Sequence, residues 1–269
     1  MNDLKKIKIA WFGLHAGEEP PLVPAGGIFF SGCNLRCAFC QNFQISQSGL
    51  GRLCSVAELT DIMLQLQAAG AINIDLVTPT IWAAEIKEAI RLAKEKGLEI
   101  PIVWNSNGYE KIETLRTLEG LVDIYLPDFK YGDAGLAEKY SGIKNYPAVA
   151  EAAIREMWRQ VGRLEIKNGR ARRGLIIRHM VLPDNLENSF AVLEKIAAIS
   201  PDIHVSLMNQ YFPLYGAARF PELGRTVTAD EFEQVYEYSR AAGLGDGWIQ
   251  SEDSRENLIP DFTKEKPFE

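Results

Sequence analysis

Three of the four cysteines in this 269-residue chain lie within eight residues, at Cys33, Cys37 and Cys40. They follow a short apolar run at residues 27–30 and have the spacing Cys-x3-Cys-x2-Cys. Three thiolates on one loop can ligate a metal centre, but structural zinc takes four N or S ligands and an ordinary [4Fe–4S] cluster takes four cysteines. The pattern therefore predicts a cluster with one iron left open for a substrate or cofactor, as in catalytic metal sites.

Two other interpretations of the cysteines are weaker. A zinc site would need a histidine, and His15, His179 and His204 all lie far from the motif in sequence, without zinc-knuckle spacing. A disulfide has little use in an enzyme of this length with an intracellular type of composition. Cys54 stands alone before a predicted helix, so we interpret it as a buried structural thiol and not as a fourth ligand.

The composition limits the class of protein. Hydrophobic residues make up 46% of the chain and charged residues 24%, as in packed globular proteins. The net charge of −7 argues against a nucleic-acid partner, which would need a basic face. No apolar run reaches the roughly 18 residues of a membrane span, and no secretory segment follows the N-terminal residues. We therefore expect a cytoplasmic protein that binds neither nucleic acid nor membrane.

The elements that position the cysteines alternate along the chain. We expect strands at residues 28–31, 72–77, 101–104, 123–126, 175–178 and 203–207, separated by segments of helical periodicity. Ser55 with Glu58 has the capping-box pattern at the start of the first helix, and Gly70 ends it. Strands that alternate with helices pair in parallel through right-handed crossovers. Six units fall short of a closed eight-stranded barrel, so the expected fold is α/β, an open partial (β/α)6 barrel.

We expect one domain over residues 1–269, because no repeat or linker divides the chain. An N-terminal arm would cover residues 1–26, with proline and turn residues at 14–22. The partial barrel would cover residues 27–250, and a C-terminal tail residues 251–269. A basic loop is expected at residues 167–174. An open arc without an extra domain would also leave the lower end of the barrel accessible to a loop of a macromolecular substrate.

Polar residues follow several of the predicted strands, where sites form in parallel α/β folds. Taken singly, Asn105 and Asn107 would be assigned to turn formation near Gly108. Taken together, the polar residues at four strand ends predict a pocket beside the cysteines. These candidates are Asn105, Ser106, Asn107, Asp128, Lys130, Arg178, Asn209 and Gln210.

The cysteine motif, with Phe39 directly before its last cysteine, resembles the signature of the radical S-adenosylmethionine (SAM) superfamily. The resemblance implies the same open barrel and a [4Fe–4S] cluster whose open iron chelates SAM. It implies that an electron from flavodoxin or ferredoxin cleaves the sulfonium of SAM. The resulting 5′-deoxyadenosyl radical would abstract hydrogen from a substrate carbon, with the protein providing positioning and shielding.

Four short motifs resemble pyruvate formate-lyase activating enzyme more narrowly, and the whole chain, with residues 104–110, resembles its PflX-type branch. Cys40-Gln41-Asn42 is similar to its Cys-His-Asn, Ser106-Asn107-Gly108 to its Thr-Asn-Gly, Asp128-Phe129-Lys130 to its Asp-Leu-Lys, and Arg178 with Val181 and Pro183 to its Arg-x-x-Val-x-Pro. A glycyl-radical enzyme is then one expected partner, and another peptide or a small molecule is the alternative substrate. An iron–sulfur electron carrier or sensor is the alternative of a different class, but it would fill all four iron positions.

The resemblance assigns roles to individual residues. Phe39 would lie against the adenine, since a flat apolar face suits a base. Asn107 and Arg178 would contact SAM, Arg178 through the carboxylate that a guanidinium binds well. Asp128, with Asn105 or Ser106 nearby, would stand where the family holds a monovalent cation beside SAM.

The chain departs from the family pattern at three places. Asn105 takes the place of a second carboxylate, which weakens the expected cation binding. After the second strand the family shows Gly-Gly-Glu-Pro, which holds the amino group of SAM, but here Thr78 and Thr80 offer hydroxyl groups and no carboxylate. Some activases carry a cysteine-rich insert before that strand, but only Cys54 lies there, so we expect one cluster.

Overall fold

The computed structural model of the protein describes residues 6–250 and 259–268. Within them one sheet has the strand order β10-β9-β8-β6-β5-β4-β2-β1-β3, with β7 paired to β8. The parallel part consists of β2 (Ala25–Phe30), β4 (Ile74–Val77), β5 (Ile102–Ser106), β6 (Ile124–Pro127), β8 (Arg170–Met180), β9 (His204–Met208) and β10 (Gly247–Gln250). In the described chain β10 and β3 (Arg52–Ser55) are the two edges and do not pair. The predicted open, partial α/β barrel is therefore confirmed.

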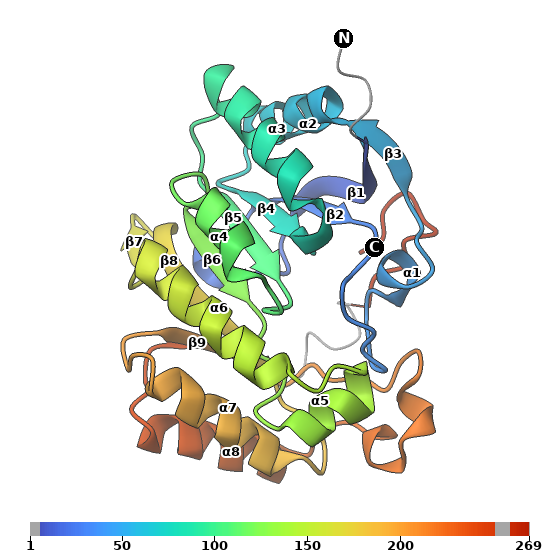
Figure 1. The fold of residues 1–269 in the computed structure, drawn as a ribbon, viewed down its shortest axis with the longest axis vertical. Helices are drawn as coiled ribbons and strands as arrows, with labels where there is room; N and C mark the ends of the chain where they lie inside the picture. Colours follow the sequence, from blue (N-terminus) through green and yellow to red (C-terminus); the bar gives the residue numbers. More distant parts are fainter. Residues whose placement is uncertain (1–5, 251–258, 269) are drawn as a thin grey trace.

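Helices cover the outer face of this sheet (Figure 1). Apolar side chains of the strands, such as Ile28, Leu76 and Trp104, are fully buried in one core with the helices. The predicted capping box is present, since Ser55 and Glu58 exchange hydrogen bonds of 2.7 and 3.1 Å. The α-helices of the described chain are α1 (Phe43–Ser46), α2 (Val56–Ala68), α3 (Ala83–Glu95), α4 (Ile112–Leu118), α5 (Ala134–Ser141), α6 (Tyr146–Val161), α7 (Leu186–Ala197) and α8 (Ala229–Ala241).

Four strands were not predicted from the sequence. β1 (Lys6–His15) pairs antiparallel with β2 and β3, so the segment 1–26 is only partly the expected irregular arm. The basic loop is instead a hairpin of β7 (Glu165–Lys167) and β8, turned by Asn168 and Gly169 at φ 54° and 74°. β10 adds a seventh parallel strand of four residues, too short to give a periodic signal.

The N-terminal arm closes the end of the barrel opposite the cysteines. After β1 the chain enters the concave side of the sheet and forms the 3-10 helix η1 (Pro20–Leu22). Leu22 is 1% exposed and packs in one apolar cluster with Val103, Ile124 and Ile176. Its carbonyl accepts a 2.7 Å hydrogen bond from Asn73 Nδ2. The expectation of an accessible lower end is therefore wrong, because the arm supplies the apolar layer that fills it.

The C-terminal segment returns to the first strands. Phe262 and Phe268 pack against Phe29 of β2, with ring centroids 5.6 and 5.2 Å away. Residues 259–268 of the predicted tail thus cover part of the sheet, and residues 251–258 and 269 lie outside the described chain. In the described residues, no helix combines the length and the apolar character needed to cross a membrane.

Candidate functional site

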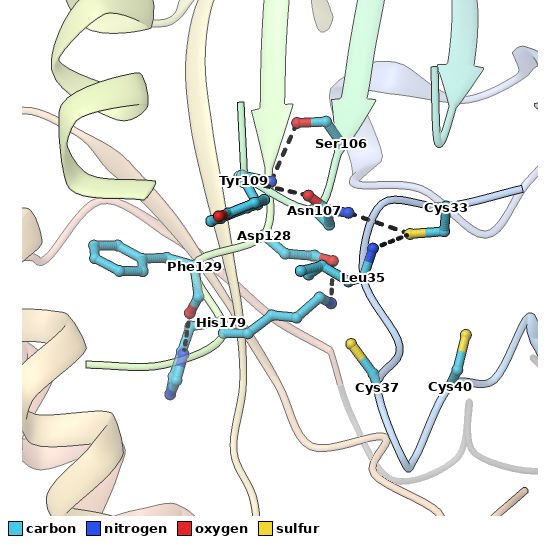
Figure 2. Close-up of polar contacts among 12 residues, drawn as sticks. Cys33, Leu35, Cys37, Cys40, Ser106, Asn107, Tyr109, Asp128, Phe129 and His179 are labelled. Carbon is cyan, nitrogen blue, oxygen red and sulfur yellow. Dashed lines mark hydrogen bonds and ion pairs between the residues drawn. The ribbon is translucent and has the colours of Figure 1, made fainter. Parts of the chain in front are cut away.

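The cysteine loop begins where β2 ends and is held by backbone hydrogen bonds. Gly32 has φ 88°, and its N–H donates to the carbonyl of Ile45 at 3.0 Å. Further along, the N–H of Ala38 donates to Tyr140 at 2.8 Å, and its carbonyl accepts from Gly216 at 2.7 Å. Figure 2 shows the sulfur atoms of the three cysteines around one common space. The loop conformation, fixed by distant parts of the chain, therefore gathers the sulfur atoms at one place.

Each of the three cysteine sulfurs has a hydrogen-bonding neighbour. Asn107 Nδ2 donates to Cys33 Sγ at 3.3 Å, as Figure 2 shows, and the N–H of Leu35 donates to the same atom at 3.4 Å. Ser141 Oγ donates to Cys37 Sγ at 3.1 Å, and Ser46 Oγ lies 3.1 Å from Cys40 Sγ. Such hydrogen bonds stabilise negative charge on sulfur, so the surroundings suit thiolates bound to a metal centre.

Burial of the cysteines also affects whether their thiol groups are protonated. Burial raises the pKa of Cys33, and burial with the neighbouring Cys37 raises the pKa of Cys40 to about 12. Without metal these groups are therefore thiols, and metal binding must displace their protons. No three His, Cys, Asp or Glu side chains in the described chain are arranged around a single metal ion. Three sulfurs that face one space with hydrogen-bond donors fit the chemistry of a cluster ligand set.

A cavity of about 200 Å³ joins the cysteines to the ends of the parallel strands. It is lined by most of the residues predicted as cofactor contacts: Phe39, Asn42, Thr78, Asn105, Ser106, Asn107, Asp128, Lys130, Arg178 and Gln210. Asn209 is buried but does not line it. Thr80 points away, because its hydroxyl donates to Glu110 Oε1 at 2.9 Å and borders a second cavity of about 750 Å³ outside the barrel. That larger cavity lacks the cysteines, so the smaller one is the candidate site.

Arg178 is held by two glutamates of the arm that the sequence analysis did not select. Its Nε and Nη2 donate to Glu19 Oε1 and Oε2 at 2.8 and 2.7 Å, and Nη2 also donates to Glu18. Burial opposes the charge on the guanidinium, but the two carboxylates outweigh it, so the pKa of Arg178 is raised. The pairing of these glutamates with Arg178 could not be recognised from the sequence Gly17-Glu18-Glu19-Pro20, since charged residues before proline are common in exposed turns.

Asp75 is a third buried carboxylate near the arm. It lies in the middle of β4, 1% exposed, and its Oδ2 accepts a 3.3 Å hydrogen bond from Asn105 Nδ2. Burial, and next the negative charge of Glu18, raise the pKa of Asp75 well above its ordinary value. A signal was present in the sequence, because an acidic residue inside an apolar strand is almost never fully buried without a partner.

Asp128 forms an ion pair with Lys130. Lys130 Nζ lies 2.5 Å from Asp128 Oδ2, and burial of the ammonium is outweighed by this carboxylate, so the pKa of Lys130 is raised. The backbone on either side is tied together by Tyr146, whose hydroxyl donates to the carbonyls of Asn107 and Asp128 at 2.8 and 3.0 Å. Asp128 therefore has a positive partner within the chain.

Thr78 has an unusual backbone conformation at the cavity wall. Its φ is 60°, although it is β-branched and precedes Pro79, two features that disfavour this region. Its N–H donates to the carbonyl of Asn105 at 2.9 Å, so the turn is tied to β5. Strain of this kind collects at functional sites, where it fixes the direction of a hydroxyl or carbonyl group.

Phe39 lies in an aromatic cluster beside the cavity. It is 3% exposed, and the rings of Tyr131, Tyr140 and Tyr211 meet it edge-on with centroids 5.9 to 6.5 Å away. Cys54 is buried as predicted, opposite Ile7 in the β1–β3 pair, and does not line the cavity.

The histidines differ in their positions. His15 lies on the cavity wall, despite its distance from the cysteines in sequence, with Nε2 3.6 Å from Glu18. Burial lowers the pKa of His15, so the ring is neutral at pH 7. His179 is fully buried between Phe129 and Ser189, and burial lowers its pKa to about 4. His179 is thus a structural residue beside the site.

The family follows from sequence similarity. Residues 28–164, just over half of the chain, match the model of the Radical SAM superfamily. The chain is also 32% identical over 252 residues to Uncharacterized protein MJ0674 of Methanocaldococcus jannaschii, covering 89% of this chain and 70% of that protein. The chain therefore belongs to the radical SAM superfamily. Its members are enzymes of radical chemistry that use a [4Fe–4S] cluster and SAM.

Two solved structures of SuiB show the same fold. Streptococcus suis SuiB bound to precursor peptide SuiA has a TM-score of 0.60 at 14% identity, covering 90% of this chain and 52% of SuiB. SuiB bound to S-adenosylmethionine has a TM-score of 0.58, covering 82% of this chain and 48% of SuiB. The chain thus spans about half the length of SuiB. A domain of pyruvate-formate lyase-activating enzyme from Bacteroides vulgatus ATCC 8482 gives a TM-score of 0.46 at 12% identity.

Proposed function

We propose that this protein is a radical SAM oxidoreductase that cleaves SAM reductively and abstracts hydrogen from a substrate carbon. Cys33, Cys37 and Cys40 would hold one [4Fe–4S] cluster, and SAM would bind in the adjoining cavity. The observation that carries the proposal is the shared cavity wall. The three sulfurs, each beside a hydrogen-bonding group, border the same space as polar residues from four strand ends.

When bound, the cluster and SAM supply a one-electron cleavage that releases methionine and a 5′-deoxyadenosyl radical. The protein's own part is to orient and shield these groups. Phe39 offers a flat apolar face for the adenine, and Thr78, Asn42, Ser106 and Gln210 offer hydroxyl and amide groups at the rim. Phe268 and Pro260 of the C-terminal segment also border the cavity, where apolar side chains exclude water.

Asn107 and Arg178 already make hydrogen bonds within the protein, so each has a structural role besides the proposed contact with SAM. Asn107 Nδ2 is shared between Cys33 and Asn34, at 3.3 and 2.7 Å, so it first orients the cysteine loop. In the described chain Arg178 donates its side-chain hydrogen bonds through Nε and Nη2. Its Nη1 can therefore donate to the carboxylate of SAM. Arg178→Ala should then weaken SAM binding by roughly 1.5–3 kcal/mol, the usual scale for a hydrogen bond to a charged group.

The substrate approaches from the side of the cysteines, because the arm fills the opposite end of the barrel. Among substrates, the motif resemblance favours a backbone carbon of a glycyl-radical enzyme, with flavodoxin or ferredoxin as electron donor. SuiB, which shares the fold, is known bound to a precursor peptide, so another peptide is the second candidate.

Anaerobic reconstitution followed by reduction with dithionite tests the proposal. SAM should be converted to methionine and 5′-deoxyadenosine, slowly without substrate and faster when the correct partner is added. A glycyl-radical partner would show its radical by electron paramagnetic resonance. A cluster that is reduced reversibly while SAM stays intact would instead indicate an electron carrier or sensor.

A further inference from the structure

A second cavity, of about 750 Å³, lies outside the barrel and plays no part in the binding of SAM proposed above. We call it the outer groove. Its walls are the 3-10 helix η2 (Thr80–Trp82), the segment between β5 and α4, the first turn of α4 and the first two turns of α6. A cleft of this volume is within the range of ligand-binding sites, and the side chains that line it indicate what it binds.

The lining of the outer groove is mainly aliphatic. The aliphatic side chains come from η2, α4 and α6, and they are Ile81, Ile112, Ala148, Val149 and Ala152. Ile81 is 46% exposed, and with its neighbours it makes an apolar patch of the kind that marks interaction sites. Covering such a patch is favourable because it removes apolar area from water.

The charged groups of the outer groove are balanced. Of its lining residues, Lys111 and Glu113 are exposed and carry opposite charges. Glu110 is 2% exposed and accepts 2.9 Å hydrogen bonds from Thr80 and Trp104, so its carboxyl group is already bound within the protein. The exposed part of the described lining therefore has no excess of one sign, and uncharged apolar groups fit it best.

The cysteine loop forms one wall of the outer groove. Asn34, directly after Cys33, lines it. Ile81 packs on the start of the loop, since a Cβ atom on Gly32 would lie only 2.6 Å from Ile81 Cδ1. A ligand in the groove therefore lies against the same loop that carries the three cysteines.

A thin wall separates the outer groove from the cavity proposed for SAM. The two share no lining residue in the described chain, because Asn34 and Tyr109 line the groove, whereas Cys33 and Asn107 line the cavity. Asn34 Nδ2 donates to the carbonyl of Tyr109 at 2.8 Å. Asn107 Nδ2 donates to Asn34 Oδ1 at 2.7 Å and to Cys33 Sγ at 3.3 Å, the second bond being drawn in Figure 2. A molecule confined to the groove is thus separated from the cysteines, whereas a longer chain can extend past the wall.

We propose that the outer groove binds two apolar side chains of an extended polypeptide substrate, whose backbone continues past this wall to the SAM cavity. Ala148 and Ala152 of α6 are about 6 Å apart along the helix axis. Alternate side chains of an extended chain lie on one face, about 6.6 Å apart, so two of them match this spacing. This inference rests on the proposed function, because the polypeptide has to present a carbon at the SAM cavity.

Peptide binding to the anaerobically reconstituted protein with SAM, followed by fluorescence anisotropy, tests the proposal. The probes are labelled peptides of serine with a glycine at each end, carrying leucine at two alternate positions, at two adjacent positions or nowhere. The alternate peptide should bind about tenfold or more tighter than the peptide without leucine, since burial of one leucine side chain already changes affinity by about that factor. The adjacent peptide should lie between them, because only one of its leucines can enter.

Two variants of α6 change the groove itself. Ala148→Trp, which fills it, and Ala152→Glu, which adds a charge to it, should each remove the preference for the alternate peptide. Ala57→Trp is the matched control, since Ala57 is an exposed alanine in the first turn of α2 and lines neither cavity. Iron content and thermal unfolding of each variant separate loss of binding from loss of the fold.

Full preference in both α6 variants, or equal binding of the three peptides to the wild type, would overturn the proposal. So would a wild-type dimer that Ala148→Trp dissociates in sedimentation analysis, because a second copy of the chain would then cover the groove. Protein that holds its cluster and prefers the alternate peptide, but does not cleave SAM, would contradict the proposed function and leave the groove a peptide-binding site.

Discussion

Ser141 Oγ donates a 3.1 Å hydrogen bond to Cys37 Sγ across 104 residues of sequence. Ser141 is the last residue of α5 and is 3% exposed. Its hydroxyl lies 2.7 Å from the hydroxyl of Tyr131, so Tyr131, Ser141 and Cys37 form one buried hydrogen-bonded chain. Because a hydrogen bond to a cluster ligand stabilises the more negative, reduced state, this chain should raise the reduction potential.

Ser141→Ala should lower the midpoint potential of the reconstituted cluster by tens of millivolts, since about 59 mV corresponds to a tenfold change for one electron. Tyr131→Phe should act in the same direction with a smaller effect. A redox titration followed by electron paramagnetic resonance measures both. Ser239→Ala is the control, because this buried hydroxyl of α8 donates to the carbonyl of Leu244 and not to a cysteine. An unchanged potential in Ser141→Ala with full iron content would contradict the assignment.

Replacing any one of Cys33, Cys37 and Cys40 with Ala should abolish the cluster, because in the proposed site each would supply one of only three thiolates to it. Cys54→Ala should keep it, since Cys54 is buried in the β1–β3 pair away from the cavity. Iron and sulfide analysis and the absorption of anaerobic samples provide the measurement. Iron lost from Cys54→Ala, or retained in Cys37→Ala, would show that the ligand set is different.

Lys130 should take the place of the monovalent cation expected beside Asp128. Wild-type SAM cleavage should then be unchanged when tetramethylammonium replaces Na⁺ and K⁺, because the ammonium lies 2.5 Å from the carboxylate. Lys130→Ala should lower the rate several-fold, because it leaves the half-buried carboxylate of Asp128 without its cation, and K⁺ should restore part of the rate. The double variant with Asp128→Asn should not respond to K⁺. A wild-type enzyme that requires K⁺ would favour a bound cation instead.

Thr78→Gly should stabilise the protein by about 1 kcal/mol, because relief of a left-handed strain of about 1–3 kcal/mol outweighs the cost of about 0.4–1 kcal/mol for the added flexibility of the unfolded chain. Thr78→Val keeps the strain and removes the hydroxyl, so its stability should match the wild type. Both should weaken SAM binding if the turn presents the hydroxyl. Chemical denaturation and titration with SAM measure the two effects separately. Wild-type affinity in both variants would mean that the turn does not contact the ligand.

The sequence predicted the fold and the superfamily well, because the strand pattern and the cysteine motif are both short-range patterns. The strand at residues 101–104 is a continuous apolar run, as expected of a parallel strand buried on both faces, and residues 72–77 are apolar at four of six positions. Cys33, Cys37 and Cys40 have a spacing that few other sites share. The edge elements were missed, since β10 has only four residues and β1 was interpreted as part of an arm.

The inner polar residues could not be predicted in the same way. Glu18 and Arg178 are 160 residues apart, and no local pattern indicates that the arm enters the barrel. Likewise, Ser141 is the last residue of a helix of ordinary composition, and only the tertiary structure brings it to Cys37. Contacts of this range depend on how the whole chain packs, which a single sequence does not reveal.

The arm also has a mechanical consequence for the sheet. A closed barrel keeps its curvature because its first and last strands pair, but here β3 and β10 are free edges in the described chain. The arm crosses the hollow side instead, from β1 to Leu22 in the apolar layer and, through Glu19, to Arg178 on β8. It therefore acts as an internal cross-link between distant strands. Shortening the chain from its N-terminal end should let the arc flatten and spread the two halves of the site apart.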